Sequence, residues 1–358
     1  MPTLFDPVQL GDIACPNRIL MAPLTRGRAD AASVPNDLMR LYYEQRASAG
    51  LIISEATGIS KEGLGWPYAP GLWTEAQTEA WKPITEAVHK AGGRIIAQLW
   101  HMGRLVHSSF NDGKQPVSAS ATTGPGQAHT TIGRQSLEEA RPLTISEIPR
   151  VIADYAAAAE NAKRAGFDGV QLHSANGYLI DQFLRDNSNF RDDDYGGPIP
   201  NRIRLLREVA TALCDVWGAG RVSVRLSPNG ESQGVDDSNP EPLFSAAAAA
   251  LNDLGIGFLE LREPDNKGTF GATNVPRLSP ILRQHFKGAL VTNSDRTPVE
   301  AQAELNAGID AVSFGRPFMA NPDLVRRFAE GLPLNTLGGP KTWYEPGAAG
   351  YTDYPFAA

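Results

Sequence analysis

An order of local signals that recurs along the chain constrains the fold more than any other feature. Each copy consists of a helix-capping residue, a segment with helical spacing of apolar residues, a glycine and a short apolar run. In the clearest copy, Thr144 and Glu147 have the spacing of a capping box, and Gly166 suits the position after a helix. The apolar run at 169–173 then has the length and composition of a buried strand. Each copy therefore predicts one helix followed by one strand.

Eight strands are predicted in this way. They lie at 17–25, 51–59, 94–101, 169–173, 222–228, 258–262, 288–293 and 311–317. Strands that alternate with helices form parallel sheets through right-handed crossovers, and eight such units favour a closed (β/α)8 barrel, the TIM barrel. A doubly wound sheet is the alternative, but the G-x-G-x-x-G dinucleotide fingerprint is absent. We therefore predict an α/β protein in which residues 1–358 form a single barrel domain.

Two segments interrupt the repeated order. Residues 102–143 are rich in Pro, Ser, Thr and Gly, and long loops in compact domains are usually functional. We interpret this insertion as a lid that follows the third strand. Residues 338–358 have no helical period but carry five aromatic side chains, so we expect this tail to pack over the mouth of the barrel.

Composition excludes several classes of function. The net charge is −7 without any block of like charges, so neither nucleic acid nor an anionic membrane surface is an expected partner. Two cysteines are too few for a disulfide framework, a four-cysteine zinc site or an iron–sulfur cluster, and we predict no metal site. No signal-peptide pattern and no apolar run of about 20 residues are present, so we expect a cytoplasmic protein.

The predicted strands end in polar residues, which matters because the active site of a TIM barrel lies at the carboxyl ends of its strands. These residues are Thr25, Arg26, Gln98, His101, His173, Asn176, Arg225, Asn293, Ser294, Gly315 and Arg316. Such a set suits a ligand rich in carbonyl and phosphate oxygens, with the phosphate near strands 7 and 8. No lysine stands at a strand end, which argues against a Schiff-base aldolase.

Six local sequences together resemble the Old Yellow Enzyme family of FMN-dependent ene-reductases, including the bacterial N-ethylmaleimide, glycerol trinitrate and pentaerythritol tetranitrate reductases. The matching segments are 17–26, 98–104, 173–184, 191–202, 314–317 and 350–355. The twelve-residue run HSANGYLIDQFL at 173–184 is the most specific of them. The resemblance spans nearly the whole chain.

The resemblance implies non-covalent FMN and NADPH or NADH as the hydride donor. The residues it assigns to FMN are Pro23, Leu24, Thr25, Ala56, Gln98, Arg225, Asn293, Ser294, Gly315 and Arg316. Arg225 would stabilise the negative charge of the reduced flavin near N1 and O2, and Thr25 would lie at O4. Asp295 departs from the Gly- or Ala-rich loop of relatives, and we expect its carboxylate to turn outward at a helix N-terminus.

The resemblance also assigns the reacting groups. His173 and Asn176 would hydrogen-bond the oxygen of the substrate, and Tyr178 would donate a proton to its α-carbon. Further substrate-pocket residues would be Trp66, Trp100 and Tyr351. The implied reaction is ping-pong reduction of the activated C=C bond of enones, enals, maleimides and nitroalkenes, with nitrate esters as a further candidate class. We expect only small molecules as partners, and the protein to be a monomer or a homodimer.

Two other functions stay open at this point. A phosphate-binding TIM-barrel isomerase or lyase without redox chemistry would need a catalytic lysine or a carboxylate pair at the strand ends, and the sequence offers neither. A barrel that binds its ligand without catalysis would be colourless, or would carry a flavin that nicotinamides do not bleach.

Overall fold

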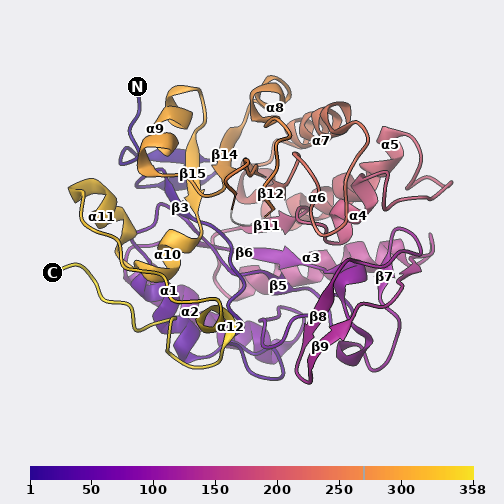
Figure 1. Cartoon of the computed structure of the whole chain (residues 1–358), viewed down its shortest axis with the longest axis horizontal. Coiled ribbons are helices and arrows are strands. Elements are labelled where there is room, and N and C mark those ends of the chain that lie inside the picture. Colours follow the sequence, from indigo (N-terminus) through magenta and orange to yellow (C-terminus); the bar gives the residue numbers. More distant parts are fainter. Residues whose placement is uncertain (269–270) are drawn as a thin grey trace.

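Eight parallel strands close on themselves in the computed structural model, which describes residues 1–268 and 271–358 (Figure 1). In chain order they are β3 (Ile19–Met21), β4 (Ile52–Ile53), β6 (Ile95–Trp100), β11 (Val170–His173), β12 (Val222–Leu226), β13 (Phe258–Arg262), β14 (Ala289–Asn293) and β15 (Ala311–Phe314). Each strand pairs with the next, and β15 pairs with β3 to close the ring. The predicted (β/α)8 barrel is confirmed.

Helices surround the strands (Figure 1). They are α1 (Asp37–Gln45), α2 (Glu75–Lys90), α3 (Ile148–Arg164), α4 (Leu179–Leu184), α5 (Ile199–Arg202), α6 (Arg204–Trp217), α7 (Pro240–Leu254), α8 (Ser279–His285), α9 (Pro298–Asn306), α10 (Arg316–Ala320), α11 (Leu324–Glu330) and α12 (Lys341–Tyr344). Their buried apolar faces and the outer faces of the strands share one continuous core. No helix of the described residues is both long enough and apolar enough to cross a membrane.

The helix starts test the local signals of the sequence. Capping boxes form at Thr74 before α2 and at Thr297 before α9, where each threonine hydroxyl accepts from the backbone three residues on. At Thr144 only half of the predicted capping box forms. The backbone N–H of Thr144 donates to the carboxylate of Glu147, but α3 begins only at Ile148, so the threonine is not its cap.

A hairpin closes one end of the barrel. Strands β1 (Val8–Leu10) and β2 (Ile13–Cys15) pair antiparallel, and their side chains pack with Leu20, Ile96 and Phe258 from the barrel strands. At the hairpin turn Gly11 has φ +59°, and a Cβ there would lie 2.1 Å from the carbonyl oxygen of Gly220, so only glycine fits. With this floor in place, the carboxyl ends of the strands form the open end.

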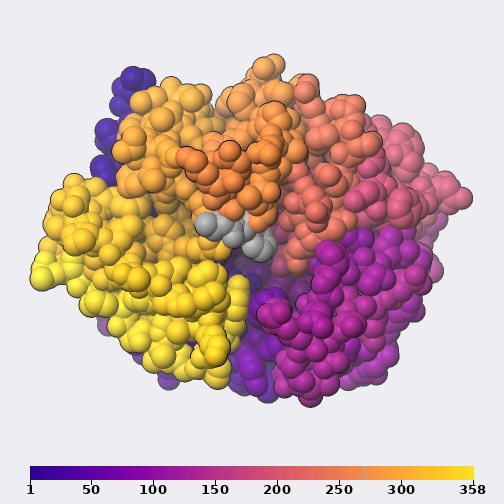
Figure 2. Space-filling model, in the orientation of Figure 1, coloured from indigo at the N-terminus to yellow at the C-terminus, as the bar shows by residue number. Residues whose placement is uncertain are grey.

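Two segments lie at that open end, one on each side of a hollow (Figure 2). Residues 102–143 contain β7 (Val117–Ser118), β8 (Gln127–Thr130), β9 (Gly133–Ser136) and β10 (Arg141–Pro142), with β8 and β9 paired as a hairpin. The other segment is the C-terminal stretch that carries α12.

The predicted strand at 51–59 is in two parts, since β4 ends at Ile53 and a separate β5 (Thr57–Gly58) pairs farther along β6.

Candidate active site

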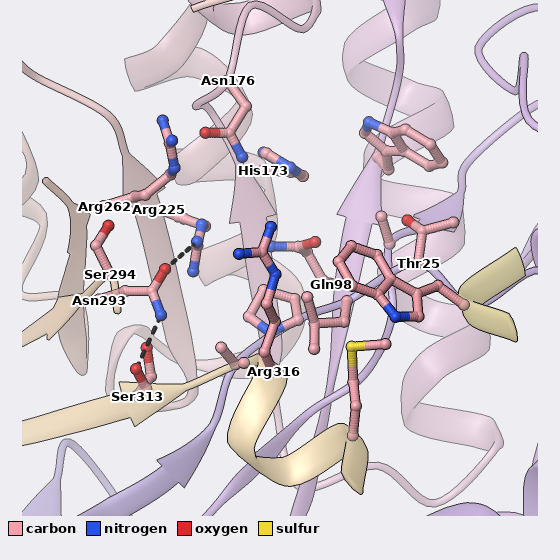
Figure 3. A pocket seen from close by; sticks show the side chains of 18 of the residues that line it. Thr25, Gln98, His173, Asn176, Arg225, Arg262, Asn293, Ser294, Ser313 and Arg316 are labelled. Carbon is pink, nitrogen blue, oxygen red and sulfur yellow. Dashed lines mark hydrogen bonds between the residues drawn. The ribbon is translucent and has the colours of Figure 1, made fainter. Parts of the chain in front are cut away.

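A cavity of about 480 Å³ opens at the carboxyl ends of the strands. Fifteen of the sixteen residues predicted to bind cofactor or substrate line it: Pro23, Leu24, Thr25, Ala56, Trp66, Gln98, Trp100, His173, Asn176, Tyr178, Arg225, Asn293, Ser294, Gly315 and Arg316. They come from seven of the eight strands or from the segments that follow them, and only β13 contributes none of them. The barrel therefore brings together residues that lie almost 300 positions apart in the sequence (Figure 3).

Tyr351 is the exception, and its predicted place in the substrate pocket is wrong. The side chain is fully buried and is not among the residues that line the cavity. Its ring stacks on Tyr42, with the guanidinium groups of Arg26 and Arg28 centred 5.0 and 4.8 Å from it. The aromatic residues that the tail places at the cavity are Trp343 and Tyr344, on α12.

Arg26 and Arg28 hold this tail against the barrel. Arg26 donates to the backbone carbonyls of Trp343 and Gly350 at 3.1 and 2.7 Å. Arg28 donates to those of Trp343 and Thr342 at 2.5 and 2.8 Å. Arg26 thus follows a strand end, as predicted, but it binds the backbone of the tail and does not line the cavity.

A hydrogen-bonded network lies beneath the cavity, inside the barrel. Arg225 contacts the Glu260 carboxylate at 2.7 Å with Nη1 and donates to the Asn293 side chain at 2.7 Å with Nη2. Gln98 donates to Gln171 at 2.8 Å, and Gln171 donates to Glu260 at 3.0 Å. Arg225 and Gln98 line the cavity, whereas Glu260 and Gln171 lie completely buried below it.

The imidazole of His173 is neutral and oriented. Burial, reinforced by the charge of Arg225, lowers the pKa of His173 well below 6.5. Its Nδ1 accepts a hydrogen bond from the backbone N–H of Ala175 at 3.4 Å. A neutral ring whose Nδ1 accepts carries its proton on Nε2, so His173 presents a donor to the cavity.

Asn176 lies beside His173 and is held in an unusual backbone conformation. Its φ is +60°, a region that asparagine tolerates better than most residues. Its backbone N–H donates to Ser227 at 2.8 Å, and its carbonyl accepts from Gln233 at 2.6 Å. The amide nitrogen of its side chain lies on the side facing His173 (Figure 3). Two hydrogen-bond donors therefore point to one region.

Tyr178 lies next to this pair, just before α4. Its ring meets the rings of His173 and Trp100 edge to face, with centroids 4.8 and 5.0 Å apart. Burial raises the pKa of Tyr178 to about 12, so its hydroxyl keeps its proton at neutral pH.

The loop after β14 differs from what the sequence indicates. Asp295 lines the cavity with its carboxylate 4.0 Å from the guanidinium of Arg316, and it lies before the α9 cap at Thr297. The expectation that Asp295 turns outward as a helix N-terminal acid is therefore wrong. Ser294 and Asp295 have φ of +139° and +29°, which costs about 1–3 kcal/mol at each non-glycine residue.

Aromatic rings from three distant segments form one wall of the cavity. Trp66 packs against His129 of the β8–β9 hairpin at 4.8 Å and against Tyr344 of α12 at 5.1 Å between ring centroids. Of these three residues, sequence reasoning places only Trp66 in the pocket. His129 and Tyr344 lie in the two segments expected over the barrel mouth, but nothing in their local sequence singles them out.

Arg262 and Glu260 are also missing from the predicted site. Arg262 ends β13 and lines the cavity, so the strand-end criterion could have found it. Glu260 is two residues earlier on the same strand and faces the same way, into the barrel. Burial next to Arg225 lowers the pKa of Arg262 to about 10, which leaves it charged at neutral pH.

Within the described ranges, no cluster of three His, Cys, Asp or Glu side chains could hold a metal ion.

Known proteins resemble this chain in both sequence and fold. The profile of the NADH:flavin oxidoreductase / NADH oxidase family matches residues 3–335. A putative 12-oxophytodienoate reductase 11 from Oryza sativa subsp. japonica is 40% identical, over 99% of this chain and 97% of that protein. The 12-oxophytodienoate reductase 2 of Arabidopsis thaliana is 38% identical, over 98% of this chain and 95% of its own length.

Solved structures agree with these relatives. The Old Yellow Enzyme homologue from Zymomonas mobilis is 58% identical, covers 99% of both chains and superimposes with a TM-score of 0.97. Morphinone reductase is 46% identical, covers 99% of this chain and 96% of its own, and has a TM-score of 0.95. These matches confirm the predicted FMN and nicotinamide donor. The chain belongs to the NADH:flavin oxidoreductase / NADH oxidase family, as a flavin oxidoreductase of the Old Yellow Enzyme type.

Proposed function

We propose that this enzyme reduces the activated C=C bond of α,β-unsaturated carbonyl compounds and nitroalkenes, with maleimides and nitrate esters as further acceptors. The observation that carries the proposal is the convergence of His173 and Asn176 on one region of the cavity, which Tyr178 also lines with its ring against His173. Relatives named as reductases of 12-oxophytodienoate and of morphinone support an oxo compound as the acceptor.

The cavity fits FMN, whose chemistry when bound is to pass a hydride from the nicotinamide to the acceptor. Arg225 offers a buried cation whose Nε has no hydrogen-bond partner among the described residues. The flavin-ring contacts would come from Pro23, Leu24, Thr25, Ala56 and Gln98, and the phosphate contacts from Asn293, Ser294, Gly315 and Arg316.

His173 and Asn176 would polarise the substrate. Both would donate hydrogen bonds to the carbonyl or nitro oxygen, which withdraws electron density from the β-carbon and makes it accept a hydride. The negative charge that develops on the oxygen would be stabilised by the same two donors. Because His173 is neutral, its donor capacity does not depend on pH near neutrality.

Tyr178 would supply the proton. Its hydroxyl group keeps its proton at neutral pH, and the α-carbon becomes strongly basic as the β-carbon gains a hydride. Proton transfer to that carbon is therefore downhill despite the high pKa of the phenol.

One pocket would serve both the nicotinamide and the acceptor, since the elements of the described residues form this barrel and include no separate dinucleotide-binding fold. A morphinone reductase structure in complex with tetrahydroNAD, 46% identical to this chain, supports nicotinamide binding in such a barrel. Residues 102–143 and the aromatic tail would cover this pocket through His129, Trp343 and Tyr344, with Trp66 and Trp100 contacting the acceptor.

An anaerobic stopped-flow experiment tests the proposal. NADPH or NADH should bleach the absorbance of the bound flavin, and an enone or nitroalkene should restore it, with parallel lines in steady-state kinetics. Bleaching without reoxidation by any of these acceptors would remove the proposed substrate class. The competing isomerase or lyase gains no support, because the described lining of the cavity includes no lysine and only one carboxylate, Asp295.

A further inference from the structure

Glu260 is the meeting point of the network beneath the cavity. Its side chain is completely buried; its carboxylate forms an ion pair with Arg225 at 2.7 Å and accepts hydrogen bonds from Gln171 at 3.0 Å and from the hydroxyl group of Ser313. An ionised carboxylate in a buried position is stable only when it is paired and hydrogen-bonded, and Glu260 meets both conditions. It does not line the cavity itself, so anything it does there acts through its neighbours.

The carboxylate fixes the orientation of two glutamine side chains in series. Because it only accepts hydrogen bonds, Gln171 must turn its amide nitrogen toward Glu260. The amide oxygen of Gln171 then faces Gln98, which must donate to it through Nε2. Gln98 is left to present its amide oxygen, an acceptor, to the cavity. A single buried charge thus determines the polarity of a group that lines the cavity.

The same carboxylate fixes Arg225 and offsets part of its charge. The guanidinium contacts both Glu260 and Asn293. The side chain of Asn293 in turn donates to the Ser313 carbonyl at 2.8 Å (Figure 3). These contacts hold the cation at one place in the lining of the cavity. The negative charge of Glu260, 2.7 Å from Nη1, also weakens the positive electrostatic potential that Arg225 produces in the cavity.

We propose that Glu260 is the positioning residue for the cofactor side of the cavity, which orients Arg225 and Gln98 and holds down the reduction potential of the bound flavin. This inference rests on the proposed placement of FMN against Arg225. Reduced flavin carries more negative charge than oxidised flavin, so the nearby negative charge of Glu260 disfavours reduction. Removing that charge while keeping the side-chain volume therefore raises the midpoint potential.

The test compares the FMN-loaded parent enzyme with Glu260→Gln by anaerobic reductive titration against a reference dye. We expect Glu260→Gln to shift the midpoint potential to a more positive value. We also expect it to raise the FMN dissociation constant about tenfold, a loss of about 1.4 kcal/mol, because the orientation of Gln171 and Gln98 is no longer fixed. A Glu260→Gln holoenzyme with the potential of the parent would overturn the proposal.

Glu263→Gln is the matched control. Glu263 lies three residues later and is equally buried, but its carboxylate accepts from the backbone N–H groups of Leu278 and Ser279, at 2.6 and 3.0 Å. It should lose stability without a change in potential. An equal shift in both variants would show that loss of either buried glutamate changes the potential in the same way, and would contradict the specific role of Glu260.

Two further variants separate this inference from the proposed placement of FMN. Arg225→Gln should lower the potential, and an unchanged potential there would contradict the placement of FMN against Arg225. If Glu260→Gln fails to fold, the double variant Arg225→Gln/Glu260→Gln avoids a buried unpaired charge. The double variant should have a more positive potential than Arg225→Gln alone, and equal potentials would overturn the role of Glu260.

Discussion

Tyr351 stacks on Tyr42 with their ring centroids 4.0 Å apart and their planes only 9° from parallel. This contact ties the C-terminal tail to α1, and neither ring lines the cavity. Arg26 and Arg28 reach the tail from the same side, so the stack belongs to the structure that carries Trp343 and Tyr344 to the cavity.

Truncation of Tyr351 should therefore reduce stability, while loss of its hydroxyl group should not alter catalysis. Tyr351→Ala leaves a large buried cavity and should lower the free energy of unfolding by about 3–5 kcal/mol in denaturant titrations. Tyr351→Phe removes a buried hydroxyl that has no hydrogen-bond partner among the described residues, so its stability should match or exceed that of the parent. A changed KM for enones in Tyr351→Phe would contradict the position assigned here.

Arg28→Ala should weaken acceptor binding with little effect on the bound flavin. The variant frees the carbonyls of Thr342 and Trp343, so the aromatic wall loses its fixed position. We expect KM for a bulky enone to rise about tenfold, equivalent to about 1.4 kcal/mol, with the rate of flavin reduction by the nicotinamide unchanged. Arg40→Ala is the control and should behave as the parent, because this partly exposed arginine of α1 pairs only with Asp37 and Glu44 at the surface.

Tyr178→Phe should separate the two half-reactions. Without the phenol, reoxidation of the flavin by an enone should slow by about 10²–10⁴-fold, the usual contribution of a positioned acid. Flavin reduction by NADPH or NADH should keep the parent rate, because it needs no proton from Tyr178. An enone reoxidation rate equal to that of the parent would show that water supplies the proton.

The parent enzyme should keep the proton-donating form of Tyr178 well into alkaline solution. Its pKa is raised to about 12, so ionisation of this residue should not reduce the enone rate between pH 7 and about pH 10. Stopped-flow reoxidation across this range checks the prediction. A fall in rate centred near pH 10 would mean that the phenol is not desolvated in the working enzyme.

Stability should fall on mild acidification because two buried histidines resist protonation. Burial lowers the pKa of His101 to about 4 and that of His173 well below 6.5. The unfolded chain binds protons there first, so this stability is complete above about pH 6.5 and is lost as pH falls toward 4. His101 alone contributes about 3 kcal/mol over that range. Urea unfolding at saturating FMN should show this fall in the free energy of unfolding, and His101→Gln should make that free energy depend less on pH.

The sequence by itself determined the barrel, because its signals are local. A capping threonine, an apolar helical face, a glycine and a β-branched run each act over a few residues, and repetition of that order leaves few ways to bury eight strands. The rule that active sites lie at the carboxyl ends of barrel strands then selected His173, Asn176 and Arg225. The family resemblance added their expected roles and the cofactor.

Only the tertiary structure decided which groups meet across the chain. Glu260 reads as one polar residue in a strand until its distance to Arg225 is known, and Tyr351 reads as a pocket aromatic until its stacking on Tyr42 is seen. Asp295 likewise depends on where Arg316 lies. Local sequence cannot encode these contacts, since packing and electrostatics depend on distances between segments that are brought together only when the barrel closes.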